Sequence, residues 1–365
     1  MARLVDEAHA KYKDLKDGKN ADYIPILATI PSELFGVAIA LPDGTVFTAG
    51  DVDYRFAIES TSKPFTAALV MQQYGGPQAI VDKIGVEPTG LPFNSRLALE
   101  IYGARSVNPL VNAGAIAAVS LVQASSERDR WQQVLAYLRD FAGGADLPLL
   151  EEVYQSEYET SWGNRAIANL LYNYERLYAD PEETLRVYTK QCSIGVSTKE
   201  LAMMGATLAN GGVSPQTGKR LLAESSVPEL LAIMLSAGFY DESGAWAYSA
   251  GLPAKTGVGG GIVAIVREGE DFSGLVGEHA IDFSGDYAAL LRSSENADPD
   301  TWGHLVTDPF VPVVPTLVFH QLSEVDDPAV VARRDPVALL AESEHFESEI
   351  APLGYFALLR DRKFV

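Results

Sequence analysis

Residues 55–63, Arg-Phe-Ala-Ile-Glu-Ser-Thr-Ser-Lys, decide the fold, because a short apolar run ends there at a cluster of hydroxyl residues. We expect a strand over 55–59 and a helix over 64–71. Ser60 is predicted at the N-cap of this helix, where a hydroxyl is favoured and backbone N–H groups point outward. Lys63 follows about one turn later on the same face. A hydroxyl and an amine at a helix N-terminus predict a nucleophile and its base, with oxyanion donors beside them.

A second motif, Lys255-Thr256-Gly257, lies between apolar runs at 245–252 and 261–266, both of which we predict to be strands. Ser-x-x-Lys early in a chain and Lys-Thr-Gly late is the motif pair of serine β-lactamases and penicillin-binding enzymes. The pair favours a serine acyl-transfer site, whereas the hydroxyl of Ser60 alone is equally well explained as a helix cap. Lys255 either contacts the substrate or acts only as a nearby positive charge, which would help to lower the pKa of Lys63.

Composition limits the class of protein. The chain has 365 residues, of which 47% are hydrophobic, enough to bury the core of one large or two ordinary domains. Lys and Arg number 28 against 49 Asp and Glu, and the net charge of -21 argues against nucleic acid or an anionic membrane as partner. The sequence shows neither a phosphate-binding glycine loop nor metal-ligand spacing, so we expect no cofactor and no metal.

The sequence also predicts a cytoplasmic location. Cys192 is the single cysteine, which rules out a disulfide framework and suits a reducing compartment. Residues 1–20 mix charges of both signs without the apolar run of a secretion signal. No stretch approaches the roughly 20 apolar residues that span a bilayer.

The positions of the histidines argue against a Ser-His-Asp triad. None lies between residues 10 and 278, where all the candidate motifs occur; the five are His9, His279, His304, His320 and His345. A buried lysine loses its proton more easily than an exposed one, because burial disfavours the charged form. Lys63 is therefore the predicted base for Ser60.

The β structure is predicted from both ends of the chain. Residues 35–41 and 45–49 flank Pro42-Asp43-Gly44, and the Asp-Gly pair indicates the turn of a β-hairpin. With the strands near residues 55 and 261, we expect one sheet assembled from 30–60 and 245–267. A helical part over 77–240 is inserted between them, which indicates an α/β (α+β) fold with the site in the crevice between sheet and helices.

Helices are predicted from apolar spacing and from their caps. Ser197 with Glu200, and Ser226 with Glu229, have the spacing of capping boxes, the first for a helix over 198–209 and the second for one ending near 236. The remaining predicted helices lie over 3–16, 108–123, 131–141 and 165–177.

These motifs stand in an order that resembles the serine-dependent glutaminase family, in its bacterial and kidney-type forms. The resemblance covers residues 18–266 and rests on eight blocks at compatible spacing: 21–25 (Ala-Asp-Tyr-Ile-Pro), 60–63, 108–116 (Asn-Pro-Leu-Val-Asn-Ala-Gly-Ala-Ile), 155–157 with 164–165, 192–194 (Cys-Ser-Ile), 208–212 (Leu-Ala-Asn-Gly-Gly), 238–241 (Gly-Phe-Tyr-Asp) and 251–258. It implies a β-lactamase-like fold, an antiparallel sheet flanked by helices with a helical subdomain. It also implies hydrolysis of L-glutamine to L-glutamate and ammonia.

The resemblance assigns roles residue by residue. Ser60 matches the family's nucleophile and Lys63 its base, while Tyr240 and Tyr188 match tyrosines of the proton relay. The backbone N–H of Val258, with that of Ser60, matches the oxyanion hole. The positions that match substrate-binding residues are Tyr23, Ser60, Asn112, Glu157, Asn164, Tyr188, Tyr240 and Val258.

These residue types suit a free amino acid. The substrate is zwitterionic, so its ammonium group needs an anion such as Glu157, and its carboxylate needs uncharged donors such as Asn112 and Asn164. Each residue also has a plain structural explanation. Tyr240 has the place of an edge residue with its hydroxyl in water, and Glu157 lies in an acidic stretch typical of a solvated helix face.

The C-terminal region departs from the family. After residue 267 an acidic segment replaces the expected family sequence, and we divide the chain into a catalytic domain, 1–280, and an extension, 281–365. The extension has a Pro-rich stretch at 309–315 and two predicted helices at 329–343 and 348–360. It packs on the catalytic domain, mediates assembly or replaces the missing element of the sheet. Family members commonly form dimers and tetramers, so the resemblance implies a homo-oligomer.

Two other functions stay open from the sequence. One is a different acyl-transfer activity on the same scaffold, of β-lactamase or penicillin-binding type. The predicted cytoplasmic location and the pair of Glu157 and Asn164 argue against it. The other is a non-catalytic binding protein that retains the fold. The intact Ser60, Lys63 and Tyr240 argue against that, because a decayed site usually loses its nucleophile or base.

Overall fold

The structure is a computed structural model that describes residues 1–15, 18–101, 106–266 and 316–320. Its helices are α1 Ala2–Tyr12, α2 Lys63–Tyr74, α3 Gln78–Lys83, α4 Leu97–Ile101, α5 Asn112–Leu121, α6 Glu127–Phe141, α7 Glu151–Thr160, α8 Trp162–Asn173, α9 Pro181–Cys192, α10 Thr198–Ala209, α11 Val227–Ala237 and α12 Ser243–Ser249. Its strands are β1 Gly36–Ala40, β2 Val46–Gly50, β3 Phe56–Ala57, β4 Gly195–Val196, β5 Ala254–Gly257, β6 Gly261–Ile265 and β7 Thr316–His320. Short 3-10 turns are η1 Leu27–Thr29, η2 Glu59–Ser62, η3 Glu224–Ser226 and η4 Tyr240–Glu242.

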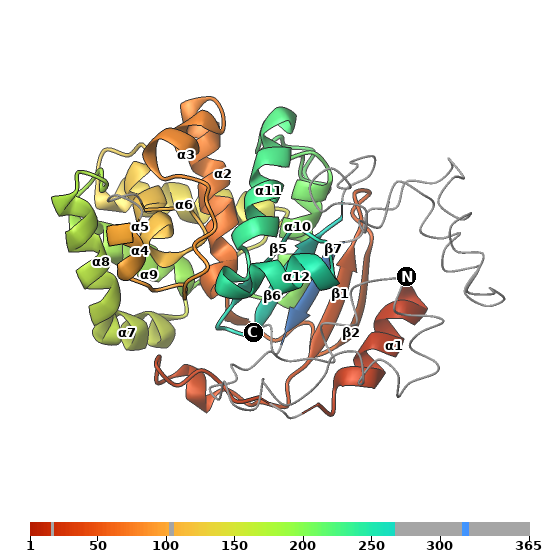
Figure 1. The fold of residues 1–365 in the computed structure, drawn as a ribbon. Coiled ribbons are helices and arrows are strands. Elements are labelled where there is room, and N and C mark those ends of the chain that lie inside the picture. The colour runs from red at the N-terminus through yellow and green to blue at the C-terminus, as the bar shows by residue number, and fades with distance from the viewer. Residues whose placement is uncertain (16–17, 102–105, 267–315, 321–365) are drawn as a thin grey trace.

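The main sheet has five antiparallel strands in the order β2-β1-β7-β6-β5. In Figure 1 it stands between α1 on one side and α10 and α11 on the other. Helix α1 contacts β1 and β2, and α10 contacts β1, β7 and β6. All five residues of β1 are buried, as expected of a strand covered on both faces.

The predicted hairpin is confirmed. Strands β1 and β2 pair from Gly36 opposite Gly50 to Ala40 opposite Val46. In the turn, the carboxylate of Asp43 accepts a hydrogen bond from the backbone N–H of Thr45. Gly44 adopts φ +86°, a left-handed conformation that favours glycine. The Asp-Gly signal therefore identified the turn and the two strands that it joins.

The C-terminal region supplies the middle strand of this sheet. Strand β7 pairs with β1 on one side and with β6 on the other, so Thr316 is opposite both Ala40 and Ile265. Residues 316–320 thus replace a missing element of the sheet, one of the three roles that the sequence left open. The expectation that the sheet comes from 30–60 and 245–267 alone omitted this strand. The Pro-rich stretch and the two predicted helices lie outside the described residues.

Two predicted strands have different structures. The segment 245–252 contains helix α12, in which Trp246 is buried and stacks on Phe239 at a ring-centroid distance of 4.0 Å. A short apolar run does not distinguish a helix from a strand, and here the tryptophan packing decides. The segment 55–59 contains β3, which pairs with β4 in a separate two-stranded sheet instead of joining the main one. Lys255-Thr256-Gly257 itself lies in β5.

The two predicted capping boxes behave differently. The Ser197 hydroxyl accepts from the backbone N–H of Glu200, and the Glu200 carboxylate accepts from the N–H of Ser197. Ser226 is the N-cap of α11, but its side chain makes no capping bond. Ser226 is also the last residue of η3, and this turn holds its backbone at φ -98° and ψ -8°. A capping hydroxyl needs an extended backbone instead. The second capping box was therefore wrong.

Helix α2 joins the two parts of the molecule. Its residues 63–71 are all buried, and Phe65 packs on Phe141 of α6 at 5.0 Å between ring centroids. Figure 1 shows α3–α9 gathered on one side of α2 and the sheet on the other. The first turn of α2 thus lies at the junction between the sheet and the helical part.

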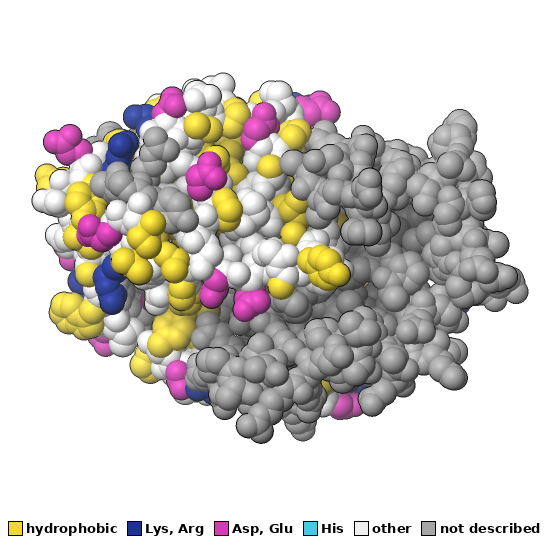
Figure 2. Space-filling view, viewed as in Figure 1, with side chains coloured by type: hydrophobic (Ala, Val, Ile, Leu, Met, Phe, Trp, Pro, Cys, Tyr) yellow, Lys and Arg dark blue, Asp and Glu magenta, His cyan; other side chains and the backbone are white. Residues whose placement is uncertain are grey.

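The surface is acidic without a single acidic patch on the face drawn in Figure 2, where acidic side chains are spread among polar and hydrophobic ones. Within the described ranges, no helix combines the length and apolar character needed to cross a bilayer.

Candidate active site

The turn η2 presents the candidate nucleophile. Glu59 begins it with φ +48°, a left-handed conformation that costs a non-glycine residue about 1–3 kcal/mol. The Ser62 hydroxyl donates to the backbone carbonyl of Glu59 at 2.6 Å, and the Thr61 hydroxyl donates to that of Ile58. Two of the three hydroxyls are thus engaged with the backbone, whereas Ser60 faces a cavity.

The predicted capping role of Ser60 is wrong. Helix α2 begins at Lys63 and its N-cap is Ser62, which makes no side-chain capping bond. The left-handed Glu59 starts a 3-10 turn before the helix, so Ser60 lies inside that turn instead of at the helix boundary. The hydroxyl of Ser60 is consequently not tied to a helix N–H.

Lys63 lies beside Ser60 in a fully buried position. Its Nζ is 2.9 Å from Oγ of Ser60 and donates to Oδ1 of Asn112 at 2.6 Å. Burial lowers the pKa of Lys63 to about 8, although Cys192, Glu59 and Glu157 act in the opposite direction. An amine with this pKa is neutral in an appreciable fraction of molecules near neutral pH, which is the state that a base requires.

Asn112 connects the pair of Ser60 and Lys63, here called the dyad, to the helical part. Its Oδ1 accepts from Lys63 and from the hydroxyl of Tyr188, the latter at 3.3 Å, while its Nδ2 donates to Oδ1 of Asn164 at 3.0 Å. Burial raises the pKa of Tyr188 well above its ordinary value, so its hydroxyl stays protonated and remains a donor. Residues of α2, α5, α8 and α9 are thereby joined in one network.

A cavity of about 180 Å³ opens next to Ser60. Its lining includes seven residues that the sequence singled out: Tyr23, Ser60, Asn112, Glu157, Asn164, Tyr188 and Val258. They come from segments more than 200 residues apart in the chain, so the fold brings them together. The lining combines hydroxyls, amides and carboxyl groups, which suits a small zwitterion.

Tyr240 lies beside the dyad but outside the cavity lining. It begins η4 with φ +58°, and its ring packs on Phe93 at 5.2 Å between ring centroids. The Nζ of Lys63 is 5.5 Å from the centroid of the Tyr240 ring. The place of Tyr240 after a helix suggested an edge residue with its hydroxyl in water. The structure instead places its ring against the base.

Lys255 is the second fully buried lysine. Its Nζ donates to the backbone carbonyls of Gly238 and Thr256, at 2.8 and 2.7 Å, and lies 3.9 Å from the centroid of the Tyr240 ring. Burial lowers the pKa of Lys255 well below its ordinary value, and the charge of Lys63 lowers it further. Lys255 thus ties the end of β5 to the turn that precedes Tyr240.

Gly257 allows the end of β5 to approach the nucleophile turn. A Cβ at this position would lie 3.1 Å from the backbone nitrogen of Ser60 and 3.0 Å from that of Thr61. Both distances are too short for a comfortable contact, so a side chain here would push the strand away. The next residue, Val258, lines the cavity with Ser60.

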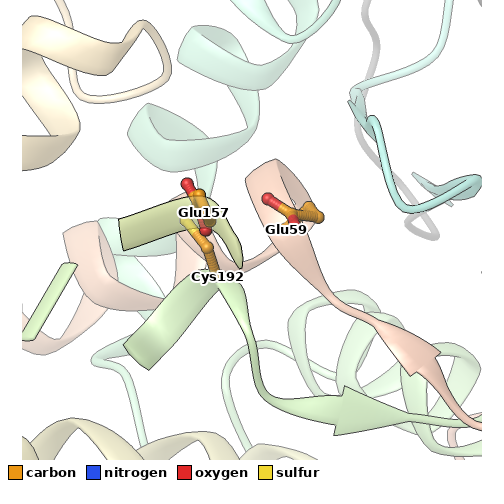
Figure 3. Close-up of side chains that lie close together, drawn as sticks. All are labelled: Glu59, Glu157 and Cys192. Carbon is orange, nitrogen blue, oxygen red and sulfur yellow. The ribbon is translucent and has the colours of Figure 1, made fainter. Parts of the chain in front are cut away.

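Three acidic groups meet at the cavity, two of which line it: Glu59, Glu157 and Cys192 (Figure 3). Their ligand atoms all lie within 4.8 Å of one another, and all three residues are buried. Two carboxylates and a thiol are suitable metal ligands, but the charge of Lys63 acts on all three groups. Because this built-in cation competes for the cluster, we assign no metal to it.

The sequence singled out none of five further lining residues: Glu59, Phe93, Asn94, Thr160 and Ser161. Glu59 did carry a signal, since it is a charged residue at the end of an apolar run next to the nucleophile. Phe93 and Asn94 lie in a segment without helix or strand periodicity, and only the tertiary fold places them at the cavity.

Comparisons with known proteins match the part of the chain that contains these site residues. The Glutaminase family model matches residues 18–270. A glutaminase of Colwellia psychrerythraea is 53% identical over 262 residues, which are 72% of this chain and 84% of that relative. Glutaminase 1 of Escherichia coli K12 is 52% identical over 266 residues, 73% of this chain and 85% of that relative.

Solved structures show the same likeness. The probable glutaminase ybaS superposes with a TM-score of 0.75 at 41% identity, covering 97% of this chain and 96% of that one. A probable glutaminase from Bacillus subtilis, complexed with 6-diazo-5-oxo-L-norleucine, gives a TM-score of 0.70 at 26% identity and covers 89% of each chain.

Proposed function

This chain belongs to the glutaminase family, and we propose that it hydrolyses L-glutamine with Ser60 as the nucleophile and Lys63 as the base. The expected α/β fold of β-lactamase type is confirmed by the structural neighbours. The single observation that carries the proposed mechanism is the 2.9 Å separation of the Ser60 hydroxyl from the fully buried amine of Lys63.

The two charged groups of the substrate are bound by different residues of the cavity lining. Glu157, which is only 6% exposed, receives the α-ammonium group, because a buried carboxylate gains most from pairing with a cation. The α-carboxylate is received by the amide of Asn164 and the hydroxyls of Tyr23 and Tyr188. These groups line one cavity with Ser60, which supports a substrate that spans it from the reacting amide to its charged end.

Acylation begins with neutral Lys63. Its amine takes the proton of the Ser60 hydroxyl as Oγ attacks the side-chain amide carbon of glutamine. The backbone N–H groups of Ser60 and Val258 stabilise the oxyanion. The close packing of Gly257 against the Ser60 nitrogen supports this placement of the second N–H.

The leaving group departs as ammonia. The carbon–nitrogen bond breaks while the Tyr240 hydroxyl gives its proton to the leaving nitrogen, and the Lys63 ammonium returns a proton to Tyr240. Water then attacks the γ-glutamyl-serine ester, Lys63 takes its proton, and Ser60 recovers that proton as glutamate is released. The contact between the Lys63 amine and the Tyr240 ring supports the relay.

The decisive experiment measures ammonia release from L-glutamine, with L-asparagine as the control substrate. We expect Ser60→Ala and Lys63→Ala to lower kcat/KM by at least about 10³-fold while the chain stays folded. Ser125→Ala and Lys219→Ala change exposed residues of the same types and should retain activity. A folded wild-type protein that releases no ammonia would instead support the non-catalytic alternative.

We further propose the catalytic unit to be residues 1–280 together with β7, working in the cytoplasm as a homo-oligomer, either dimer or tetramer. The pairing of β7 with β1 and β6 supports the first part. The free, buried Cys192 supports a reducing compartment. The oligomer rests on the family resemblance and is tested by light scattering of the purified chain.

A further inference from the structure

Glu59 is a buried carboxyl group that the proposed mechanism does not use. It is 2% exposed, lines the cavity beside Ser60, and has a carboxyl oxygen within 4.8 Å of one from Glu157 (Figure 3). Among the described residues, Oε1 of Glu59 and Oε2 of Glu157 have no hydrogen-bond partner. Two buried carboxylates this close, both ionised, would repel each other strongly.

The backbone holds Glu59 in this position. Its left-handed conformation turns the chain just before Ser60, and Gly259 makes room for the side chain. A Cβ at Gly259 would lie 3.2 Å from Cγ of Glu59 and 2.0 Å from the carbonyl oxygen of Ala57. The backbone of Ala57 therefore requires glycine at position 259, and the stem of the Glu59 side chain packs closely against it.

The charged and titratable groups around Glu59 come from several elements. Lys63 of α2 is the nearby cation, and Glu157 of α7 is the nearest carboxyl group. Cys192 of α9 completes the acidic cluster, and Tyr188 of the same helix is linked to it by a hydrogen bond. Beyond Lys63 lies Lys255 of β5, whose pKa Lys63 lowers.

We propose that Glu59 is the proton-carrying partner of Glu157, so that the two carboxyl groups share one proton and the ammonium site holds one negative charge. This inference rests on the proposed function and makes Glu59 a positioning residue for it. With Glu59 neutral, Glu157 alone balances the substrate's ammonium group, and Lys63 stays free to lose its proton. The protonated Glu59 donates its hydrogen to the Glu157 carboxylate.

The electrostatics agree with one proton shared between the two carboxyl groups. Burial raises the pKa of Glu59 to about 8, against the opposing charge of Lys63. Burial raises the pKa of Glu157 well above its ordinary value, and Glu59 raises it further. An ionised Glu59 would place a negative charge next to the oxyanion at Ser60 and would hold Lys63 in its protonated form. Wild-type activity should therefore decline again at alkaline pH, when Glu59 loses its proton.

The test is Glu59→Gln, which has the shape and the neutral charge of the protonated acid. We expect the alkaline decline of kcat/KM for L-glutamine to move to the higher pH at which the substrate's own ammonium group loses its proton. The fall of kcat/KM on the acid side of the profile, which reports protonation of Lys63, should stay at its wild-type pH. Glu151→Gln, an exposed change on the same helix as Glu157, should keep the full wild-type pH profile.

Difference infrared spectroscopy supplies a readout that a purely structural role would not change. At pH 7 wild type should show the band of a buried protonated carboxyl group, and Glu59→Gln should lack it. An alkaline decline that stays at its wild-type pH in Glu59→Gln would overturn the inference. So would a tenfold higher KM with the acid-side fall of kcat/KM moved to lower pH, since both indicate an ionised Glu59. A wild type inactive towards glutamine would refute the proposed function itself.

Discussion

Lys63 and Lys255 belong to different regions of the molecule, yet both are fully buried lysines with a lowered pKa. Lys63, at the start of α2, faces the hydroxyl of Ser60, which has a proton to give. Lys255, in β5, faces two backbone carbonyls, which can only accept hydrogen bonds. Burial prepares both lysines to lose a proton, but only the partner of Lys63 allows it to act as a base.

The strongest test of this comparison replaces Lys63 by Met, which retains most of the side-chain volume. We expect kcat to fall by at least about 10³-fold, because the Ser60 hydroxyl loses the base that lies beside it. Ammonia release measures the effect, and circular dichroism checks the fold. If Lys63→Met keeps a tenth of the activity, another group deprotonates Ser60 and the comparison fails.

Asn112→Ala tests how firmly the helical part holds the base. Removal of its amide takes away the acceptor for Lys63 and Tyr188 and the donor for Asn164. We expect a loss in kcat/KM of about 10²-fold, shared between kcat and KM, since the network both positions Lys63 and lines the cavity. An effect on KM alone would show that Asn112 binds substrate without positioning the base.

The pH profile sharpens the distinction between the two lysines. Lys63 must be neutral to act, and protonation increases as pH falls through its pKa of about 8. We therefore expect kcat/KM to fall by about tenfold for each pH unit below that value. Profiles measured with glutamine in buffers of constant ionic strength check this. A flat profile between pH 6 and pH 8 would contradict it.

Lys255→Met should have the smallest effect on activity and a clear effect on stability. The carbonyls of Gly238 and Thr256 lose the lysine as donor, and among the described residues only that of Gly238 keeps a backbone donor, the N–H of Thr256, so we expect a cost of about 1–3 kcal/mol. Tyr240 then loses the support beneath its ring, and we expect kcat to fall by about tenfold with little change in KM. Urea unfolding and steady-state kinetics separate the two effects. A loss as large as that of Lys63→Met would make Lys255 part of the chemistry.

Local signals in the sequence identified the parts of the fold that local interactions determine. The hairpin turn at Asp43-Gly44 and the capping box of Ser197 with Glu200 depend on residues two or three apart, and both are confirmed. Ser226 has the same capping spacing as Ser197, but the preceding turn fixes its backbone in another conformation. The spacing alone does not contain that information.

The sequence predicted most residues of the site but not how the fold brings them together. Seven of the singled-out residues line one cavity, because the motifs carry both chemistry and order along the chain. Glu59 was treated as the end of a strand, since its left-handed backbone and its proximity to Glu157 depend on the tertiary fold. The pairing of β7 with β1 and β6 likewise depends on contacts between distant residues, which no local pattern reveals.

The position of β7 has a consequence for how the chain folds during synthesis. The hairpin of β1 and β2 and that of β5 and β6 form from neighbouring residues, but they join only through β7. Until residue 320 has left the ribosome, each hairpin exposes an unpaired strand edge, which is a template for aggregation. Closure over such a distance is slow compared with hairpin formation, so the two hairpins form before β7 can join them.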